Sequence, residues 1–176
     1  PLQCQSTNHH MGTRMARKLD DGTYLAPHLL DFAVKQYDAT GQVLATFDTT
    51  VPGDPQREIH SWPFTAIRLP DGSTHVNLTN GNRAVRFDAA GKIIWELTNT
   101  DLPGAWLADP CGAQVLPNGN VVIANYGQRD AKLPKLIEVT PDKNVVWTHH
   151  DDIPHSAHHF QILTTNGKAI EGRAMK

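Results

Sequence analysis

The sequence has little of several residue types that would quickly narrow its class. It holds two cysteines, Cys4 and Cys111, and no Cys-x-x-Cys pair, which excludes zinc ribbons and thioredoxin-type motifs. The two cysteines could form one disulfide or stay as free thiols. Only 7% of the residues are aromatic. No apolar run reaches the roughly 18 residues of a membrane helix, so no membrane span is expected.

The sequence also has no large excess of positive or negative charge. Sixteen Lys and Arg against eighteen Asp and Glu give a net charge of -2, which excludes a strongly basic surface and nucleic acid as the expected partner. The chain begins at Pro1 without an initiator Met or a signal peptide, so we expect that processing or truncation removed what came before. Thirteen Gly and twelve Pro favour a turn-rich β protein.

What the sequence does contain is an internal repeat. A leucine is followed three residues later by a glycine, with Asp or Asn directly before that glycine. A looser fourth copy has one inserted residue. The four turn glycines, Gly22, Gly72, Gly119 and Gly167, are 50, 47 and 48 residues apart. The first three copies read Leu19-Asp20-Asp21-Gly22, Leu69-Pro70-Asp71-Gly72 and Leu116-Pro117-Asn118-Gly119.

A second turn recurs inside each repeat. Asp38-Ala39-Thr40-Gly41 matches Asp88-Ala89-Ala90-Gly91, and in the third repeat Lys143 stands where the glycine would be. Turns of this composition between apolar runs indicate β-hairpins, because the glycine supplies a positive φ. Trp95 and Trp147 follow the turn at equal offsets, with Ala45 in the first repeat. Such a repeated position predicts packing between neighbouring repeats.

Each repeat therefore predicts four short strands, placed in the second repeat near 65–69, 73–78, 84–88 and 92–97. Four antiparallel strands per ~48 residues is the pattern of a β-propeller blade. A β-sandwich would show turn signals without this period. The predicted fold is an all-β propeller in one partial domain over 1–176. Its repeats run over roughly 9–50, 60–100 and 108–150, with a final inner strand in 155–170.

The length then predicts an incomplete ring. At about 48 residues per repeat, 176 residues supply a little over three and a half blades, whereas a closed propeller needs at least four. We expect either the C-terminal part of a larger, six-bladed ring, lacking its N-terminal blades, or a half-ring that self-associates with another copy to cover its open edges.

The repeat resembles that of the quinoprotein-like (PQQ-like repeat) propellers of bacteria. The resemblance rests on the Leu-Pro-Asp-Gly turn and on the later Asp-x-x-Gly-Lys-apolar-apolar-Trp, and it includes the stretches 62–70, 108–114 and 163–168. It implies a secreted or periplasmic protein. The larger quinone-binding dehydrogenases of similar fold carry adjacent cysteines. This chain has none, so pyrroloquinoline quinone is not the expected cofactor.

A second similarity is to the arylsulfate sulfotransferases. It rests on Ile59-His60-Ser61 placed ahead of the turn at Leu69-Pro70-Asp71-Gly72. This similarity implies that His60 would lie in the central funnel and carry sulfate.

Polar residues gather just before each predicted inner strand, where a propeller has the mouth of its channel. Two interpretations of a histidine-lined channel compete. One is a divalent metal site held by His60, His158 and His159. The other is general-base or nucleophilic catalysis by His60 and His159. A third interpretation is that these are ordinary loop residues. The candidates in these segments are His10, His60, Asp109, Cys111, His155, His158 and His159.

Other candidates lie on or beside the predicted inner strands. The Trp62 ring either stacks against a bound sugar or aryl ligand or packs within its own loop. Arg14, Arg17, Arg68, Gln114 and Gln161 point toward or away from the axis by strand alternation. The leading hypothesis is binding of a small polar ligand, either a sugar or an anionic aryl compound, by His10, Trp62, Arg68, Asp109, Cys111, Gln114 and His155. The alternatives are an enzyme (lyase, hydrolase or sulfotransferase-like) and a protein-interaction scaffold.

Overall fold

The computed structural model describes residues 12–50, 60–153 and 157–171. These residues form three four-stranded antiparallel sheets, one two-stranded sheet and the short 3-10 helix η1 (Asn99–Asp101). In each four-stranded sheet the strands pair in the order in which they follow along the chain. The predicted all-β architecture of four-stranded antiparallel units is therefore confirmed.

The sheets have the following strands. The first sheet holds β1 (Arg17–Lys18), β2 (Tyr24–His28), β3 (Ala33–Tyr37) and β4 (Val43–Asp48). The second holds β5 (Pro63–Arg68), β6 (Thr74–Leu78), β7 (Arg83–Phe87) and β8 (Ile93–Thr98), all within two residues of the predicted bounds. The third holds β9 (Pro110–Val115), β10 (Val121–Asn125), β11 (Leu136–Val139) and β12 (Val145–His149). The last pair is β13 (Thr164–Thr165) and β14 (Lys168–Ala169).

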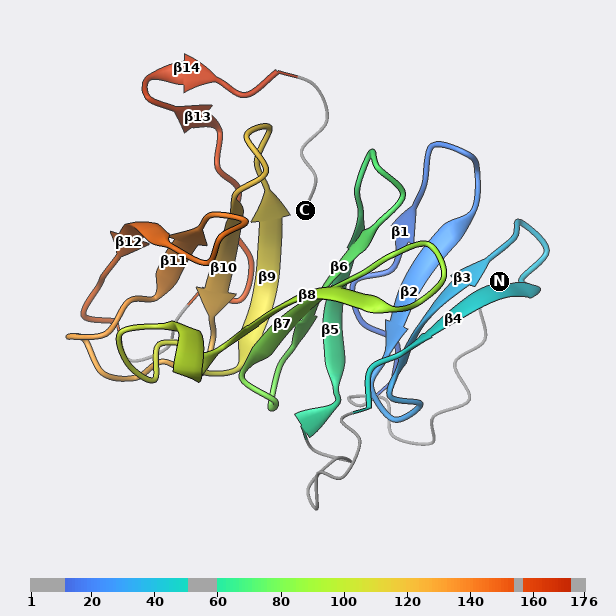
Figure 1. Cartoon of the computed structure of the whole chain (residues 1–176), viewed down its shortest axis with the longest axis horizontal. Helices are drawn as coiled ribbons and strands as arrows, with labels where there is room; N and C mark the ends of the chain where they lie inside the picture. Colours follow the sequence, from blue (N-terminus) through green and yellow to red (C-terminus); the bar gives the residue numbers. More distant parts are fainter. Residues whose placement is uncertain (1–11, 51–59, 154–156, 172–176) are drawn as a thin grey trace.

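The three large sheets lie side by side in chain order, as Figure 1 shows, with the first sheet at the right of the view and the third at the left. The first strands of the second and third sheets, β5 and β9, contact each other, and β5 also contacts β2. β2, β5 and β9 thus follow one another along a common side of the molecule, where the sequence analysis expects the channel.

The hairpin turns take the backbone conformation that their sequence predicts. Gly22, Gly72 and Gly119 have φ of +86°, +83° and +86°, values that side chains with a Cβ rarely adopt. The carboxylate of Asp71, directly before Gly72, accepts hydrogen bonds from the backbone N–H and the hydroxyl of Ser73. Lys143, which replaces a turn glycine, also lies in the left-handed region with φ +66°.

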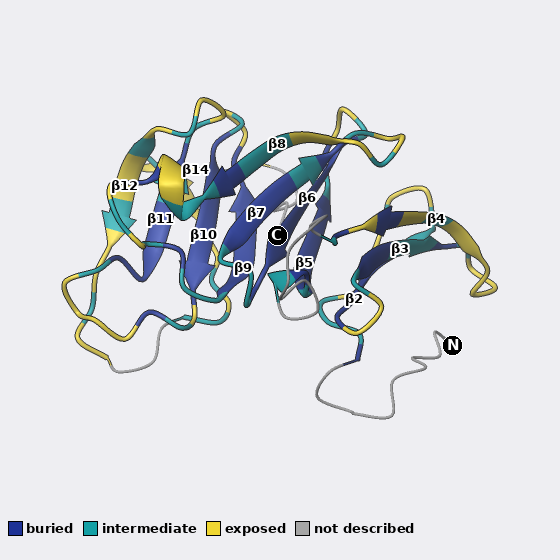
Figure 2. Cartoon of the chain, turned by 60° about the horizontal axis from the view of Figure 1, so that its bottom comes forward, coloured by how far each residue is buried: buried dark blue, intermediate teal, exposed yellow. Residues whose placement is uncertain are grey.

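Two apolar clusters join the sheets, because alternate residues of a strand point to opposite faces. On β5, Ala66 packs toward the first sheet and Ile67 toward the third. In Figure 2 the strands β5, β6 and β7 of the middle sheet are largely buried, whereas the outer turns are exposed. The first cluster is Leu25, Val34, Phe47, Ala66, Val76, Leu78, Val85 and Phe87. The second includes Ile67, Leu69, Ala84, Leu97, Val115, Val121, Ile123, Ile137 and Val139.

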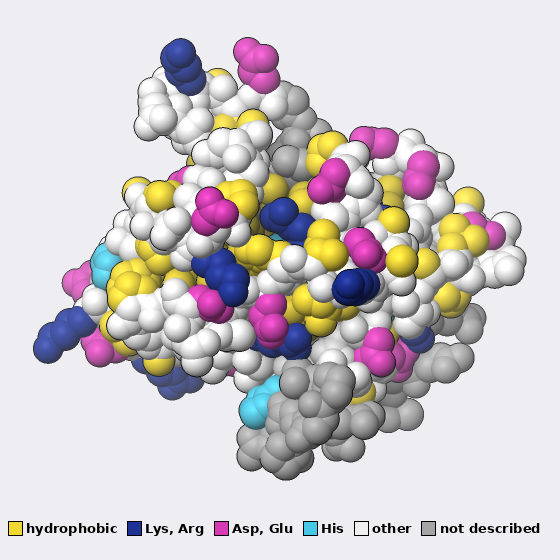
Figure 3. Space-filling model, viewed as in Figure 1, with side chains coloured by type: hydrophobic (Ala, Val, Ile, Leu, Met, Phe, Trp, Pro, Cys, Tyr) yellow, Lys and Arg dark blue, Asp and Glu magenta, His cyan; other side chains and the backbone are white. Residues whose placement is uncertain are grey.

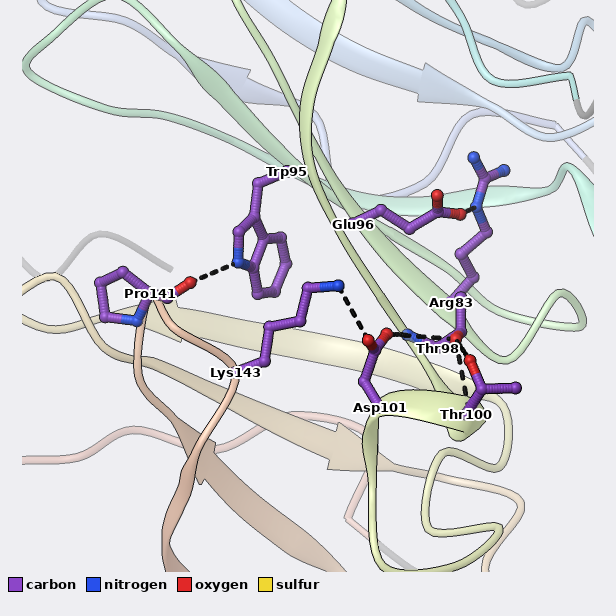
Figure 4. A network of polar contacts seen from close by, with 8 residues as sticks. All are labelled: Arg83, Trp95, Glu96, Thr98, Thr100, Asp101, Pro141 and Lys143. Carbon is purple, nitrogen blue, oxygen red and sulfur yellow. Dashed lines mark hydrogen bonds and ion pairs between the residues drawn. The ribbon is translucent and has the colours of Figure 1, made fainter.

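Trp95 joins the second sheet to the third, as its repeated position predicts. Its indole Nε1–H donates to the backbone carbonyl of Pro141 at 2.8 Å, and its ring packs against the apolar cluster between the two sheets. Beside it, the Lys143 ammonium lies 2.8 Å from the Asp101 carboxylate of η1 (Figure 4). The lysine that replaces the turn glycine therefore forms an ion pair between sheets.

Trp95→Ala is expected to lower the free energy of unfolding by about 2 kcal/mol, because it removes a partly buried ring and an inter-sheet hydrogen bond. Trp95→Phe should cost about 1 kcal/mol, mainly for the hydrogen bond. Urea denaturation measures both values. Trp147→Ala is the matched control at the same repeat position, and an equal loss there would contradict the inter-sheet role of Trp95.

His75 lies fully buried on β6 and is neutral. Asn77 donates from its amide to the carbonyls of Cys111 and Gly112 on β9. Its Oδ1 therefore accepts from His75 Nε2, at 3.0 Å. Burial, assisted by the charge of Arg86, lowers the pKa of His75 to about 3. His75 Nδ1 is buried without a hydrogen-bond partner among the described residues, so a proton there would not be stabilised.

Because the unfolded chain takes up this proton near the ordinary histidine pKa of 6.5, stability contributed by neutral His75 is present above pH 6.5. It is lost as the pH falls toward about 3. Between pH 7 and pH 5 the loss should approach about 2 kcal/mol. His75→Gln, which keeps the donor to Asn77, should flatten this dependence in pH-resolved urea melts. The exposed His150→Gln serves as control and should leave the slope as in the parent chain.

Candidate functional site

The first strands of the sheets and the segment 157–163 meet at a site lined by three different repeats. Arg17 on β1 donates to the Thr65 hydroxyl on β5 at 2.9 Å. On the other side, the backbone N–H of Gly112 on β9 donates to the carbonyl of His158 at 3.1 Å. These contacts bring residues separated by 46 to 48 positions in the sequence to one place.

A pocket of about 260 Å³ lies between these segments. Its walls combine apolar side chains with one guanidinium and one imidazole, and they include no Asp or Glu among the residues that the structure places there. The lining residues are Met15, Ala16, Arg17, Gly112, Ala113, His159 and Phe160.

Arg17 is the charged group of this pocket. Its guanidinium donates to the carbonyl of Met15 at 2.8 Å as well as to Thr65, so its orientation is held from two sides. Burial lowers the pKa of Arg17 to about 10. The side chain is therefore still positively charged at neutral pH. A partly buried guanidinium of fixed orientation is suited to binding a carboxylate or sulfate.

His158 and His159 form the histidine pair of the site. Their rings are linked by a hydrogen bond of 3.2 Å between His158 Nδ1 and His159 Nε2. The His158 ring stands edge-on against Phe64 and Tyr126, with ring centroids 4.7 and 4.8 Å apart. Burial lowers the pKa of His158, and the neighbouring His159 lowers it further. His158 is thus a neutral imidazole held between the Phe64 and Tyr126 rings, and its hydrogen bond positions His159 at the pocket wall.

Two residues predicted to bind ligand, Arg68 and Gln114, hold different parts of the fold together. Arg68 donates to Gln36 of the first sheet at 2.9 Å, and its guanidinium lies over the Phe47 ring. The reason is strand alternation, which turns Arg68 to the sheet interface. Gln114 pairs through both ends of its amide with the backbone N–H and carbonyl of Ile162. It holds segment 157–163 onto β9.

Cys111 is also placed away from the pocket lining. Its thiol is buried 3.6 Å from the Thr79 hydroxyl, and burial raises its pKa to about 12. A thiol with this pKa stays protonated at neutral pH, so it is neither a nucleophile nor a good metal ligand.

Asp109 and Trp62 lie in the loops just before β9 and β5, and His60 is helical; none of the three lines the pocket. Asp109 adopts φ +46°, and its backbone N–H donates to the Asn82 side chain. The Trp62 carbonyl accepts from the Thr79 N–H. The His60 carbonyl approaches Gly81 so closely that a Cβ there would lie 2.1 Å from it.

The predicted three-histidine metal site does not assemble from His60, His158 and His159. Within ranges 12–50, 60–153 and 157–171, no three His, Cys, Asp or Glu side chains gather closely enough to hold an ion. Cys4, His10 and His155 lie outside the described residues. The site residues that the sequence analysis missed are Met15, Phe64, Tyr126 and Phe160. Met15 and Phe160 directly follow the predicted residues Arg14 and His159, whereas nothing in the sequence marked Phe64 and Tyr126.

Comparison with known proteins supports the fold. The chain is similar in structure to a protein of unknown function from Bacteroides caccae, with 23% identity and a TM-score of 0.67, covering 84% of this chain and 53% of that one. It is also similar to virginiamycin B lyase from Staphylococcus aureus, solved as a catalytically inactive histidine-to-alanine variant with quinupristin (18% identity, TM-score 0.57, 83% and 44% covered). The sheets are blades of a β-propeller.

A third similar structure is a candidate exported protein from Bacteroides fragilis, with 11% identity and a TM-score of 0.59, covering 85% of this chain and 40% of that one. The chain thus spans about half the length of the proteins it matches or less. No family model matches the sequence, and no curated protein matches it. Among the described residues no helix has the length and hydropathy of a membrane span.

Gly112→Ala tests how the pocket wall is held. A Cβ at this position would lie 2.8 Å from the His158 carbonyl oxygen, so segment 157–162 must move off β9. Hydrogen exchange at 157–162 is expected to rise at least tenfold, while exchange in the first sheet stays as it was. Gly104→Ala, whose Cβ would meet the Trp106 side chain at 3.4 Å, is the control. Unchanged hydrogen exchange in Gly112→Ala would contradict the conclusion that segment 157–162 is held against β9 at Gly112.

Proposed function

We propose that this propeller binds a small organic anion in the pocket between β1, β9 and segment 157–163. The observation that carries the proposal is Arg17: hydrogen bonds to the Met15 carbonyl and the Thr65 hydroxyl hold its guanidinium at the wall of a pocket that is otherwise lined mainly by apolar residues. A ligand carboxylate or sulfate would accept hydrogen bonds from this guanidinium.

The apolar part of the lining supports an anion with a hydrophobic body, such as an aryl compound, over a sugar. Met15 and Phe160 offer apolar surface beside the guanidinium. Sugars are usually held by several polar side chains around their hydroxyls, and the described lining offers only Arg17 and His159 of that kind. Bidentate contact with Arg17 would orient the anionic end.

An exported location and a quinoprotein-like origin of the repeat belong to the same proposal. The Leu-Pro-Asp-Gly turn at 69–72 and the Leu-Pro-Asn-Gly turn at 116–119 support the origin. The similar exported protein of Bacteroides fragilis supports the location. Pyrroloquinoline quinone has no part in the proposal.

The test is titration calorimetry with benzoate, para-nitrophenyl sulfate and the neutral methyl glucoside. We expect the two aryl anions to bind and the glucoside not to. Arg17→Met should weaken anion binding at least tenfold, and Arg17→Lys should retain part of it. Arg68→Met is the matched control, since that guanidinium lies between sheets. Equal binding by Arg17→Met and the parent chain would contradict the proposal, provided that their circular dichroism spectra agree.

A histidine-dependent enzyme is the second candidate function. The observation that favours it is the clamped His158 beside His159, which presents an imidazole at the pocket wall. The similar virginiamycin B lyase is catalytically inactive as a histidine variant. Mass spectrometry of the bound anion after incubation separates the candidates: turnover that His159→Gln abolishes would establish an enzyme, and an unchanged ligand favours binding alone.

A further inference from the structure

The connection between β10 and β11 is longer than its counterparts in the other two large sheets. It consists of ten residues, 126–135, whereas 29–32 join β2 to β3 and 79–82 join β6 to β7 with four residues each. Four residues therefore suffice to connect these strands, and the fold does not require the other six. Loops on a rigid scaffold are where proteins often carry the residues that bind ligands. We call 126–135 the β10–β11 loop; it lies at the lower left in Figure 1.

Hydrogen bonds within the chain fix the shape of the β10–β11 loop. The Lys135 side chain is fully buried, and its ammonium donates to the carbonyl of Gln128. The Asn125 amide, just before the loop, donates to the carbonyl of Pro134 near its end. The tip, 129–132, is exposed, and Figure 3 shows charged side chains of both signs at the left of the view, where the loop reaches the surface. The loop is thus held in one conformation by contacts of its own.

The first residues of the β10–β11 loop lie against the segment that leads into β9. The backbone N–H of Tyr126 donates to the carbonyl of Asp109 at 3.2 Å, and that of Gly127 donates to the carbonyl of Ala108 at 3.0 Å. A Cβ at Gly127 would lie 2.6 Å from the Asp109 carboxylate, so this close approach requires glycine. Tyr126 therefore lies beside the first residues of β9, of which Gly112 lines the anion pocket.

The Tyr126 ring lies exposed beside the histidine pair. It is 43% exposed and meets the His158 ring edge-on, with the ring centroids 4.8 Å apart. His158 is hydrogen-bonded to His159, which lines the pocket. Tyr126 itself is not among the lining residues. A ligand whose carboxylate binds Arg17 would therefore reach the Tyr126 ring only with the far end of a longer body.

We propose that Tyr126 determines which aryl anions this site prefers, an inference that rests on the proposed binding of an organic anion by Arg17. The favoured ligand is a two-ring aryl carboxylate. Its first ring lies in the pocket beside Met15 and Phe160, and its second ring packs against Tyr126. Aromatic rings gain free energy from such contacts beyond the apolar area that they bury. Because the β10–β11 loop already holds Tyr126 in place, little conformational freedom is lost on binding.

Calorimetry with benzoate and the two-ring para-phenylbenzoate tests this role. We expect the parent chain to bind para-phenylbenzoate roughly tenfold more tightly than benzoate. Tyr126→Ala should weaken binding of para-phenylbenzoate about fivefold and that of benzoate less than about twofold, because only the longer ligand reaches the ring. Tyr126→Phe keeps the ring and should bind both anions as the parent chain does. Tyr24→Ala, which removes a tyrosine ring from the first sheet, is the matched control and should leave both affinities unchanged.

The outcomes separate this role from anion binding itself. If Arg17→Met weakens benzoate binding but Tyr126→Ala weakens both ligands equally, or neither, the role of Tyr126 is overturned and the anion site stands. If neither anion binds the parent chain, the anion site and the role of Tyr126 are both overturned. Hydrogen exchange at 157–162 is measured on the same variants and should match the parent chain. A preference that is lost only together with faster exchange there would overturn a direct contact with the Tyr126 ring.

Discussion

Face-to-face packing of four-stranded sheets is the constraint on which this structure depends. A single sheet of four short strands buries too little apolar surface to be stable alone, so each must cover its faces with its neighbours. Val34 and Phe47 of the first sheet meet Val85 and Phe87 of the second, and the second meets the third through Leu97 and Ile137. The polar links between sheets, such as Trp95 to Pro141, are added to these apolar clusters.

The same constraint explains why the fold could be read from the sequence. Each repeat must present the same faces, so turns and apolar positions recur with one period. The turn at Gly72 requires a positive φ that few residues adopt, which makes it visible in the sequence. Even Lys143, a departure from the pattern, takes the expected conformation and uses its side chain to reach Asp101.

The site was less predictable, because its residues are chosen by contacts between repeats. Arg68 turns to Gln36 and Gln114 to Ile162, partners 32 and 48 positions away. A register shift in β5 between Pro63 and Thr65 further disturbs simple alternation. Of the histidines that precede a first strand, His159 lines the pocket with His158 hydrogen-bonded to it, whereas His60 lies outside the lining. Arg17 was visible only as one of several arginines, and its fixed orientation depends on Thr65 of another repeat.

Each pocket wall belongs to a different repeat: Arg17 to the first, Gly112 to the third and His159 to the unit that follows. Arg17 lies on β1, Gly112 on β9 and His159 in the segment before β13, and repeats of this kind contact chiefly their neighbours. Duplication or loss of one repeat would thus widen or narrow the central opening without rebuilding any wall. In the evolution of such rings, the size of the opening is coupled to the number of repeats, while the charge along its wall is set by single side chains.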